Sequence, residues 1–155
     1  MKIILHYYIT TKEALPSPTL CKKYIHATLK KIFPRFNKTF EISIRFVSAK
    51  ESRTLNKKFR KKDYATNVLS FPNDEFDTPE SREASYLGDL AICSSVVQKE
   101  SIEQGKSSRS HFAHLIVHGV LHLLGYDHMK SRDAKKMENL EIAVLKNLKF
   151  ENPYS

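Results

Sequence analysis

The sequence of 155 residues has the length of one ordinary domain, and its hydrophobic residues, 41% of the total, are enough to close one core. The chain contains no apolar run near the roughly 20 residues of a membrane span, no secretory signal and no paired cysteine spacing for its two cysteines, Cys21 and Cys93. We therefore expect one soluble cytoplasmic domain over residues 1–155, and the 26 basic against 17 acidic residues, a net charge of +9, favour a polyanionic partner.

Strands and helices alternate in the first part of the chain. Apolar residues occupy every second position over residues 2–10 and again over 40–46, which is the period of half-buried strands. Between these strands, a serine-proline pair at 17–18 opens a predicted helix that ends before Pro34. The order strand, helix, strand indicates that the sheet and its covering helices begin early.

The middle of the chain is more polar. A capping box at 48–51 predicts a short helix that reaches toward Asn56. The segment 57–67 (KKFRKKDYATN) is too polar for a core element, so we expect a loop that leads into a strand over 68–71. The acidic stretch 73–83 is then expected as an exposed loop.

Helices dominate the last part. A strand is predicted over 86–92, followed by a helix that Ser95 caps and Gly105 stops. The most apolar helix of the chain is expected over 108–124, and a last amphipathic helix over 131–148. Together these elements predict an α+β domain, with about four strands in a mixed sheet and helices packed on it.

Histidines are concentrated on the apolar helix and the turn after it. Five of the seven histidines lie within the eighteen residues 111–128, and the core of the cluster reads HGVLHLLGYDH. His118 and His122 are one helical turn apart, so their rings can share one metal ion. Gly125 permits the positive φ that ends a helix, so His128 can return as a third ligand. The spacing therefore predicts a metal site at the end of this helix.

A straight stripe of His114, His118 and His122 is the competing ligand set. Three side chains along one helix face converge poorly on one tetrahedral ion, so we favour the set that includes the turn. His111 and His114 are then interpreted as packing residues or as hydrogen-bond partners of the ligands.

Three histidine ligands leave one position of a metal ion open for water, as in catalytic sites. Asp127, Cys93 or His111 would close the shell of a structural site instead. Metzincin peptidases share the spacing and carry a glutamate general base after the first histidine, but this chain has Gly119 there, which favours hydrolysis of another bond. Asp89 and Asp127 are candidates to orient the ligand histidines, with ordinary strand-end or helix-end acids as the alternative.

Together with three other segments, the histidine motif resembles the YbeY family of bacterial endoribonucleases, which are rRNA maturation factors. The matching segments are LNKKFRKKDYATNVLSFP at 55–72, YLGDLAIC at 86–93 and FENPY at 150–154. One position departs from the family pattern, because Ala65 stands where the family usually has proline. We expect a looser turn there.

The resemblance implies a metal-dependent, single-strand-specific endoribonuclease that acts in rRNA maturation, notably at the 3′ end of the small-subunit species, and in ribosome quality control. It implies one zinc ion (Zn²⁺) on the three motif histidines, an arginine that matches Arg60, and the small ribosomal subunit or its proteins as partners. The residues agree with this, because a guanidinium grips phosphate in a planar, bidentate way. Four neighbouring lysines are expected to contact the RNA backbone without sequence preference: Lys57, Lys58, Lys61 and Lys62. The alternatives are a peptidase-type metallohydrolase and a ribosome-binding module with structural zinc.

Overall fold

The computed structural model describes residues 1–13, 16–35, 37–73 and 84–155. In chain order, the elements are β1 (Lys2–Ile9), α1 (Pro18–Ile32), β2 (Thr39–Val47), α2 (Ala49–Arg60), β3 (Val68–Pro72), β4 (Ala84–Cys93), α3 (Ser94–Glu103), α4 (Ser108–Leu123) and α5 (Ser131–Asn147). The expected α+β fold with a four-stranded mixed sheet is confirmed.

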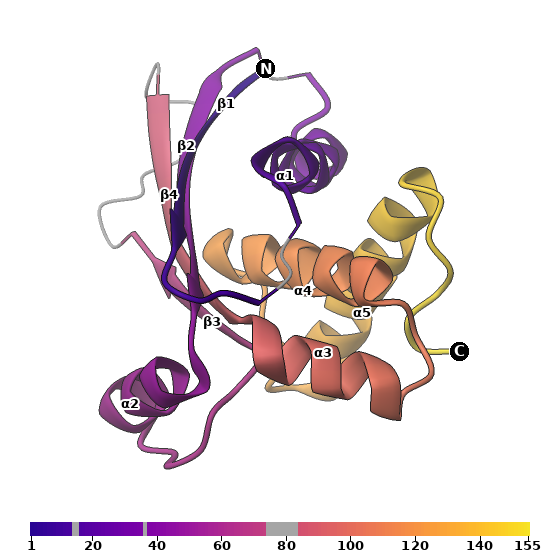
Figure 1. The fold of residues 1–155 in the computed structure, drawn as a ribbon. Coiled ribbons are helices and arrows are strands. Elements are labelled where there is room, and N and C mark those ends of the chain that lie inside the picture. The colour runs from indigo at the N-terminus through magenta and orange to yellow at the C-terminus, as the bar shows by residue number, and fades with distance from the viewer. Residues whose placement is uncertain (14–15, 36, 74–83) are drawn as a thin grey trace.

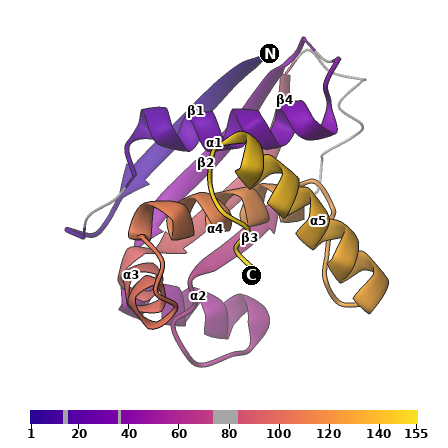
Figure 2. The same cartoon turned by 90° about the vertical axis from the view of Figure 1, so that its right-hand side faces the viewer.

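The sheet has the strand order β1-β2-β4-β3. Strands β1, β2 and β4 are parallel, and β3 is antiparallel to β4 at the edge. Figure 1 shows α1, α3, α4 and α5 on one side of the sheet and α2 at its lower end, toward the other side. In Figure 2, α1 and α4 cross the sheet and α5 lies over them. The late helices therefore form a second layer, and α4 lies inside it.

The core lies between the sheet and this helical layer. Alternate residues of β2 point into it, and Phe40, Ile42, Ile44 and Phe46 are fully buried. Helix α4 is apolar on several sides, and ten of its sixteen residues are buried, because the sheet covers one side and α1 and α5 cover the others. The predicted metal helix is thus the best-packed helix of the domain.

Helix α2 is longer than the sequence predicts. The expectation that it ends near Asn56 and that a loop covers 57–67 is wrong for the last helical turn, which continues to Arg60 before Lys61 ends it in the left-handed conformation. Two physical causes hid this turn. The buried residues of α2 are the polar Ser52 and Asn56, so no apolar stripe marks the helix. Basic residues in its last turn also interact favourably with the helix dipole, so their charge does not oppose helix formation.

Helix α3 begins without the predicted cap. It follows β4 directly from Ser94, with Cys93 at the N-cap position and no side-chain capping bond, so the role expected of Ser95 is wrong. The cause is the direct strand-to-helix junction, where the Cys93 N–H donates to the carbonyl oxygen of Asn67. Gly105, with φ +65, follows the end of the helix as expected.

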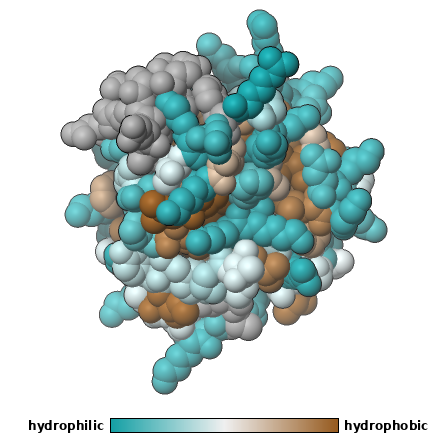
Figure 3. Space-filling view, turned by 90° about the horizontal axis from the view of Figure 1, so that it is seen from above, coloured by the Kyte–Doolittle hydropathy of each residue, from teal (hydrophilic) through white to brown (hydrophobic). Residues whose placement is uncertain are grey.

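The remaining expectations concern the surface and the cysteines. Cys21 and Cys93 are both buried and free. Among the helices of the described residues, none is long and apolar enough to cross a membrane. The acidic stretch predicted as a loop falls, apart from its first residue, on 74–83, outside the described residues. Figure 3 shows hydrophilic side chains projecting from the upper face, with hydrophobic residues in separate patches among them.

Candidate metal centre and its cleft

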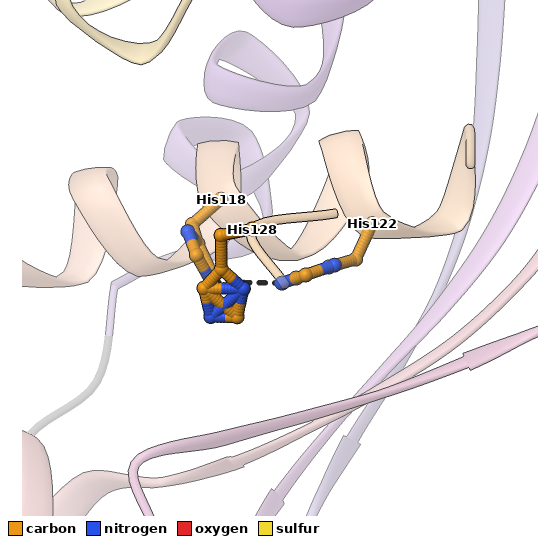
Figure 4. A group of neighbouring side chains, drawn as sticks. All are labelled: His118, His122 and His128. Atoms are coloured by element: carbon orange, nitrogen blue, oxygen red, sulfur yellow. Dashed lines mark hydrogen bonds between the residues drawn. The ribbon is translucent and has the colours of Figure 1, made fainter. Parts of the chain in front are cut away.

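The C-terminus of α4 brings the third histidine back to the other two. Gly125, with φ +97, ends the helix in a Schellman motif: its N–H donates to the carbonyl of His122, and the Tyr126 N–H donates to the carbonyl of Leu121. The chain then reverses, and His128 lies against the helix. Its ring centroid is 5.5 Å from that of His118 and 5.1 Å from that of His122 (Figure 4).

Hydrogen bonds set the tautomers of the two helical histidines. The Nδ1 of His122 lies 2.9 Å from the carbonyl oxygen of Tyr126, which can only accept, so Nδ1 carries the proton. The Nδ1 of His118 lies 2.9 Å from Oε1 of Glu141 and donates to that carboxylate. Burial tends to raise the pKa of Glu141, but hydrogen bonds from His114 and His118 outweigh it and bring the value to about 2, so the acceptor is ionised.

When both rings are neutral, the Nε2 atoms of His118 and His122 therefore carry no proton and each presents a lone pair. These two atoms lie 3.0 Å apart. Burial, together with neighbouring His118, lowers the pKa of His122 to about 4, which keeps that ring neutral at physiological pH. Two lone pairs at this distance repel each other unless a cation lies between them: a second proton on His118 or a shared metal ion. A shared metal ion could also be held by His128, because the candidate ligand nitrogens of all three residues lie within 4.8 Å of one another. Tetrahedral zinc needs ligand nitrogens about 3.3 Å apart, so these residues fit the ion after a small movement of exposed His128.

A second group, His114, His118 and Glu141, also has its ligand atoms within 4.8 Å. Glu141 accepts from the Nε2 of His114 and the Nδ1 of His118 at 2.9 Å each, so protons already satisfy these contacts. The competing stripe of His114, His118 and His122 is not among the clusters of potential metal ligands in the described residues. His114 instead supports Glu141, and His111 bonds to Glu100 at 3.0 Å, away from the ligands.

No fourth His, Cys, Asp or Glu of the described residues joins the His118, His122 and His128 group, which is the open arrangement of a catalytic site. Two aspartates, Asp89 and Asp127, were candidates to orient the ligand histidines. Within the described residues, neither bonds to one of these histidines. Asp127 accepts from the N–H of Met129 in the turn, and Asp89 accepts from the hydroxyl of Tyr86 on its own strand. The bonds that orient the rings come from Glu141 and the Tyr126 carbonyl instead.

Gly119 has a structural reason to lack a side chain. A Cβ at this position would lie 2.8 Å from one methyl carbon of Leu90 and 3.1 Å from the other, because α4 packs closely on β4. Leu90 is itself 1% exposed and has little room to move. A glutamate at 119 would point into the sheet instead of toward the candidate ligands. The glutamate general base of a metzincin peptidase is therefore absent here, and this position could not direct one toward the histidines.

The histidine centre opens into a cleft of about 430 Å³. Its lining residues are Arg60, Thr66, Asn67, Val68, Ser70, Pro72, His118, His122 and His128. The structure thus brings Arg60 and the three histidines together in the lining of one cleft. Arg60 is exposed, and no hydrogen bond or ion pair joins it to another described residue. Its guanidinium is available to an anion in the cleft.

Hydrogen bonds join α2, which ends at Arg60, to the turn at 64–66 that follows it. Ser52 bonds through its hydroxyl to both the carbonyl and the N–H of Thr66, at 2.8 and 2.9 Å. The amide of Asn56 donates to the carbonyl of Tyr64 at 2.9 Å. The turn expected to be loose at Ala65 is therefore tied to α2 on both sides. Exposed Lys57, Lys58, Lys61 and Lys62 lie on and just after the end of the same helix.

Sequence reasoning missed a role for two residues near the centre, Glu141 and Tyr154. Glu141 had a signal, because it lies between Met137 and Val144 on the buried face of α5, where a charge is unexpected. Tyr154 donates to Glu141, and burial and that carboxylate raise the pKa of Tyr154, so its hydroxyl keeps its proton. Ser70 also lines the cleft, and its hydroxyl donates to the carbonyl of Gly119 at 3.4 Å.

Comparison with known proteins adds two findings. A family model described as Endoribonuclease YbeY matches residues 9–149, which confirms the resemblance seen in the motifs. The solution structure of TM1509 from Thermotoga maritima is similar, with a TM-score of 0.58 and 20% sequence identity over 94% of this chain and 92% of that chain. At 20% identity, the similarity to TM1509 shows a shared fold and nothing further.

Proposed function

Because the chain belongs to the YbeY family of endoribonucleases, we propose that it is a metal-dependent endoribonuclease that cuts single-stranded RNA in the cleft between Arg60 and the histidines. We propose zinc as its metal and ribosomal RNA as its substrate, with action at the 3′ end of the small-subunit species. Its setting is then ribosome maturation and quality control in the cytoplasm, in contact with the small subunit or its proteins.

The observation that carries this proposal is the meeting of two chemistries in one cleft. Three imidazole nitrogens converge in the cleft, and the guanidinium of Arg60, which has no partner among the described residues, belongs to the lining of the same cleft. Zinc held by His118, His122 and His128 would acidify water to a pKa near 7 and so supply a nucleophile at neutral pH. Phosphodiester cleavage also needs positive charge where negative charge develops on the phosphate.

Arg60 supplies that charge. Its planar guanidinium can hold two phosphate oxygens together, which a lysine ammonium cannot do in the same geometry. The exposed lysines beside it extend the positive surface, so they hold the backbone of the strand on either side of the reacting phosphate. An overall charge of +9 acts in the same direction. The chain's own residues therefore bind and orient the phosphate.

The test combines metal analysis with single-turnover cleavage. The substrate is an end-labelled RNA that spans the 3′ end of small-subunit rRNA, offered single-stranded and annealed to its complement. We expect zinc-loaded protein to cut the single strand, and a chelator or His118→Ala to remove both metal and cleavage. His26→Ala, on the exposed side of α1, is the matched control and should leave both unchanged. Full cleavage by a His118→Ala protein that holds no metal would refute the proposal.

A further inference from the structure

Glu141 is a charged residue in an apolar place. Its side chain is 1% exposed, and the buried neighbours on its helix include Met137 and Val144. Three donors satisfy it: Oε1 accepts from the Nε2 of His114 and the Nδ1 of His118, both at 2.9 Å, and Oε2 accepts from the hydroxyl of Tyr154 at 2.8 Å. A buried carboxylate is costly without such partners, so each bond constrains where it lies.

Tyr154 reaches this carboxylate from the segment after α5, residues 150–155. Two contacts hold the segment in place. The ring of Phe150 packs edge-on against Tyr24 of α1, with ring centroids 5.9 Å apart. The ammonium of Lys106 donates to the carbonyl of Pro153 at 2.7 Å. Both lie on the path to Tyr154, so the position of its hydroxyl is set by packing from other parts of the fold.

We propose that Glu141 and Tyr154 are positioning residues of the metal centre and act through His118. Glu141 fixes the proton of His118 on Nδ1 and so directs the Nε2 lone pair toward the metal. The Tyr154 hydroxyl donates a hydrogen bond to the second carboxylate oxygen, which keeps the carboxylate from rotating away from the histidines. This inference rests on the proposed metal centre. It extends the centre to two residues outside the histidine motif.

The direction of the effect follows from the bonds. A carboxylate that accepts from the far nitrogen of a ligand imidazole makes the near nitrogen a stronger ligand and limits rotation of the ring. If Glu141 lost its negative charge, His118 would bind the metal more weakly and in more than one orientation. Without the Tyr154 hydroxyl, Oε2 would be buried with no donor among the described residues, and the carboxylate would turn toward other partners.

The experiment measures zinc affinity by chelator competition and the absorption spectrum of the cobalt(II)-substituted protein. We expect Glu141→Gln to lower zinc affinity about 10- to 100-fold. We expect Tyr154→Phe, which keeps the ring and loses one hydrogen bond, to lower it about 2- to 10-fold. Both variants should also change the cobalt spectrum, because it reports ligand geometry at the metal.

Two matched controls separate positioning from general destabilisation. Tyr7→Phe loses a comparable bond, to the carbonyl of Pro16, away from the centre. Glu100→Gln removes the charge from a carboxylate that bonds to His111, a histidine of α4 that is not in the ligand set. Both should leave zinc affinity and the cobalt spectrum unchanged, and equal losses in the controls would overturn the inference.

His122→Ala separates failure of the inference from failure of the metal centre. Loss of metal in His122→Ala, with wild-type affinity and spectrum in Tyr154→Phe and Glu141→Gln, would leave the centre standing and refute the positioning roles. Tyr154→Phe keeps this comparison informative even if Glu141→Gln does not fold. Full zinc affinity in His122→Ala, with loss in Glu141→Gln, would place the metal on the group of His114, His118 and Glu141 and overturn both proposals.

Discussion

Substitution of Gly125 by alanine separates the stability of the helix end from its role at the metal. Gly125 and Gly105 have φ values of +97 and +65 and end α4 and α3 in the same Schellman bonding pattern. A Cβ at either position meets no atom within 4 Å. The cost of alanine is therefore the left-handed backbone alone, about 1–2 kcal/mol at each site. We expect the upper end of this range at Gly125, because its φ lies farther from the left-handed minimum.

The two variants should both lose stability, and they should differ in zinc affinity. In Gly125→Ala, relief of the strained φ shifts the Tyr126 carbonyl that holds the ring of His122, and it shifts the chain that returns His128. We expect zinc affinity to fall by at least about 10-fold. In Gly105→Ala, the same relief occurs at the end of α3, away from the ligands, so zinc affinity should not change.

Urea unfolding in the presence of a chelator measures the loss of stability, and chelator competition measures the loss of zinc affinity. Loss of stability in both variants, with loss of zinc affinity in Gly125→Ala alone, is the expected pattern. Wild-type affinity in a destabilised Gly125→Ala protein would show that the turn does not place His128. Equal losses of affinity in the two variants would show that the effect comes from stability.

Four further predictions test other parts of the molecule. Arg60→Lys should keep the fold, the metal and the salt dependence of RNA binding, yet lose about 10- to 1000-fold in single-turnover cleavage; unchanged cleavage would remove Arg60 from the chemistry. Deletion of residues 74–83 leaves 25 basic and 12 acidic residues, a net charge of +13 in place of +9, and should preserve or strengthen RNA binding in a salt titration. Gly88→Ala should cost at least about 3 kcal/mol in urea unfolding, since φ is +136 and the new Cβ would lie 2.3 Å from the Phe71 carbonyl oxygen. Because the folded-state pKa of Glu141 is near 2 against an ordinary 4.5, its charged contacts stabilise the fold above about pH 4.5 and lose that effect as the pH falls toward 2. The stability difference between wild type and Glu141→Gln, measured with chelator, should shrink over the same interval.

Local sequence patterns predict much of this fold and of the site. The alternation over 40–46 matches the buried face of β2, because a strand periodicity of two leaves one face to the core. The spacing from His118 to His128 predicts convergence because helix geometry and one glycine turn are local properties. Such features need no knowledge of distant residues, and both appear in the structure.

The missed features depend on contacts between distant parts of the chain. The last turn of α2 has no apolar stripe, since Ser52 and Asn56 make its buried contacts through hydrogen bonds to the loop at 64–66. Glu141 and Tyr154 meet the histidines across 23 to 40 residues of sequence, and no spacing rule joins them. Their burial could be suspected from the pattern of α5, but their partners required the fold.

The close approach of Gly119 to Leu90 has a mechanical consequence for the cleft. Helix α4 buries ten of its sixteen residues and touches β4 at its glycine, so a slide or roll of the helix would cause overlap, and its two candidate ligand histidines keep their spacing. Helix α2 buries only two of twelve residues, both polar, so it belongs to the part of the fold that opens at low free-energy cost. If an RNA strand binds in the cleft as proposed, we expect α2, which carries Arg60, to adjust to it more than α4 does. For the proposed function, this places the stiff part of the domain at the three histidines, where metal binding tolerates errors of only about half an ångström, and the more compliant part at Arg60.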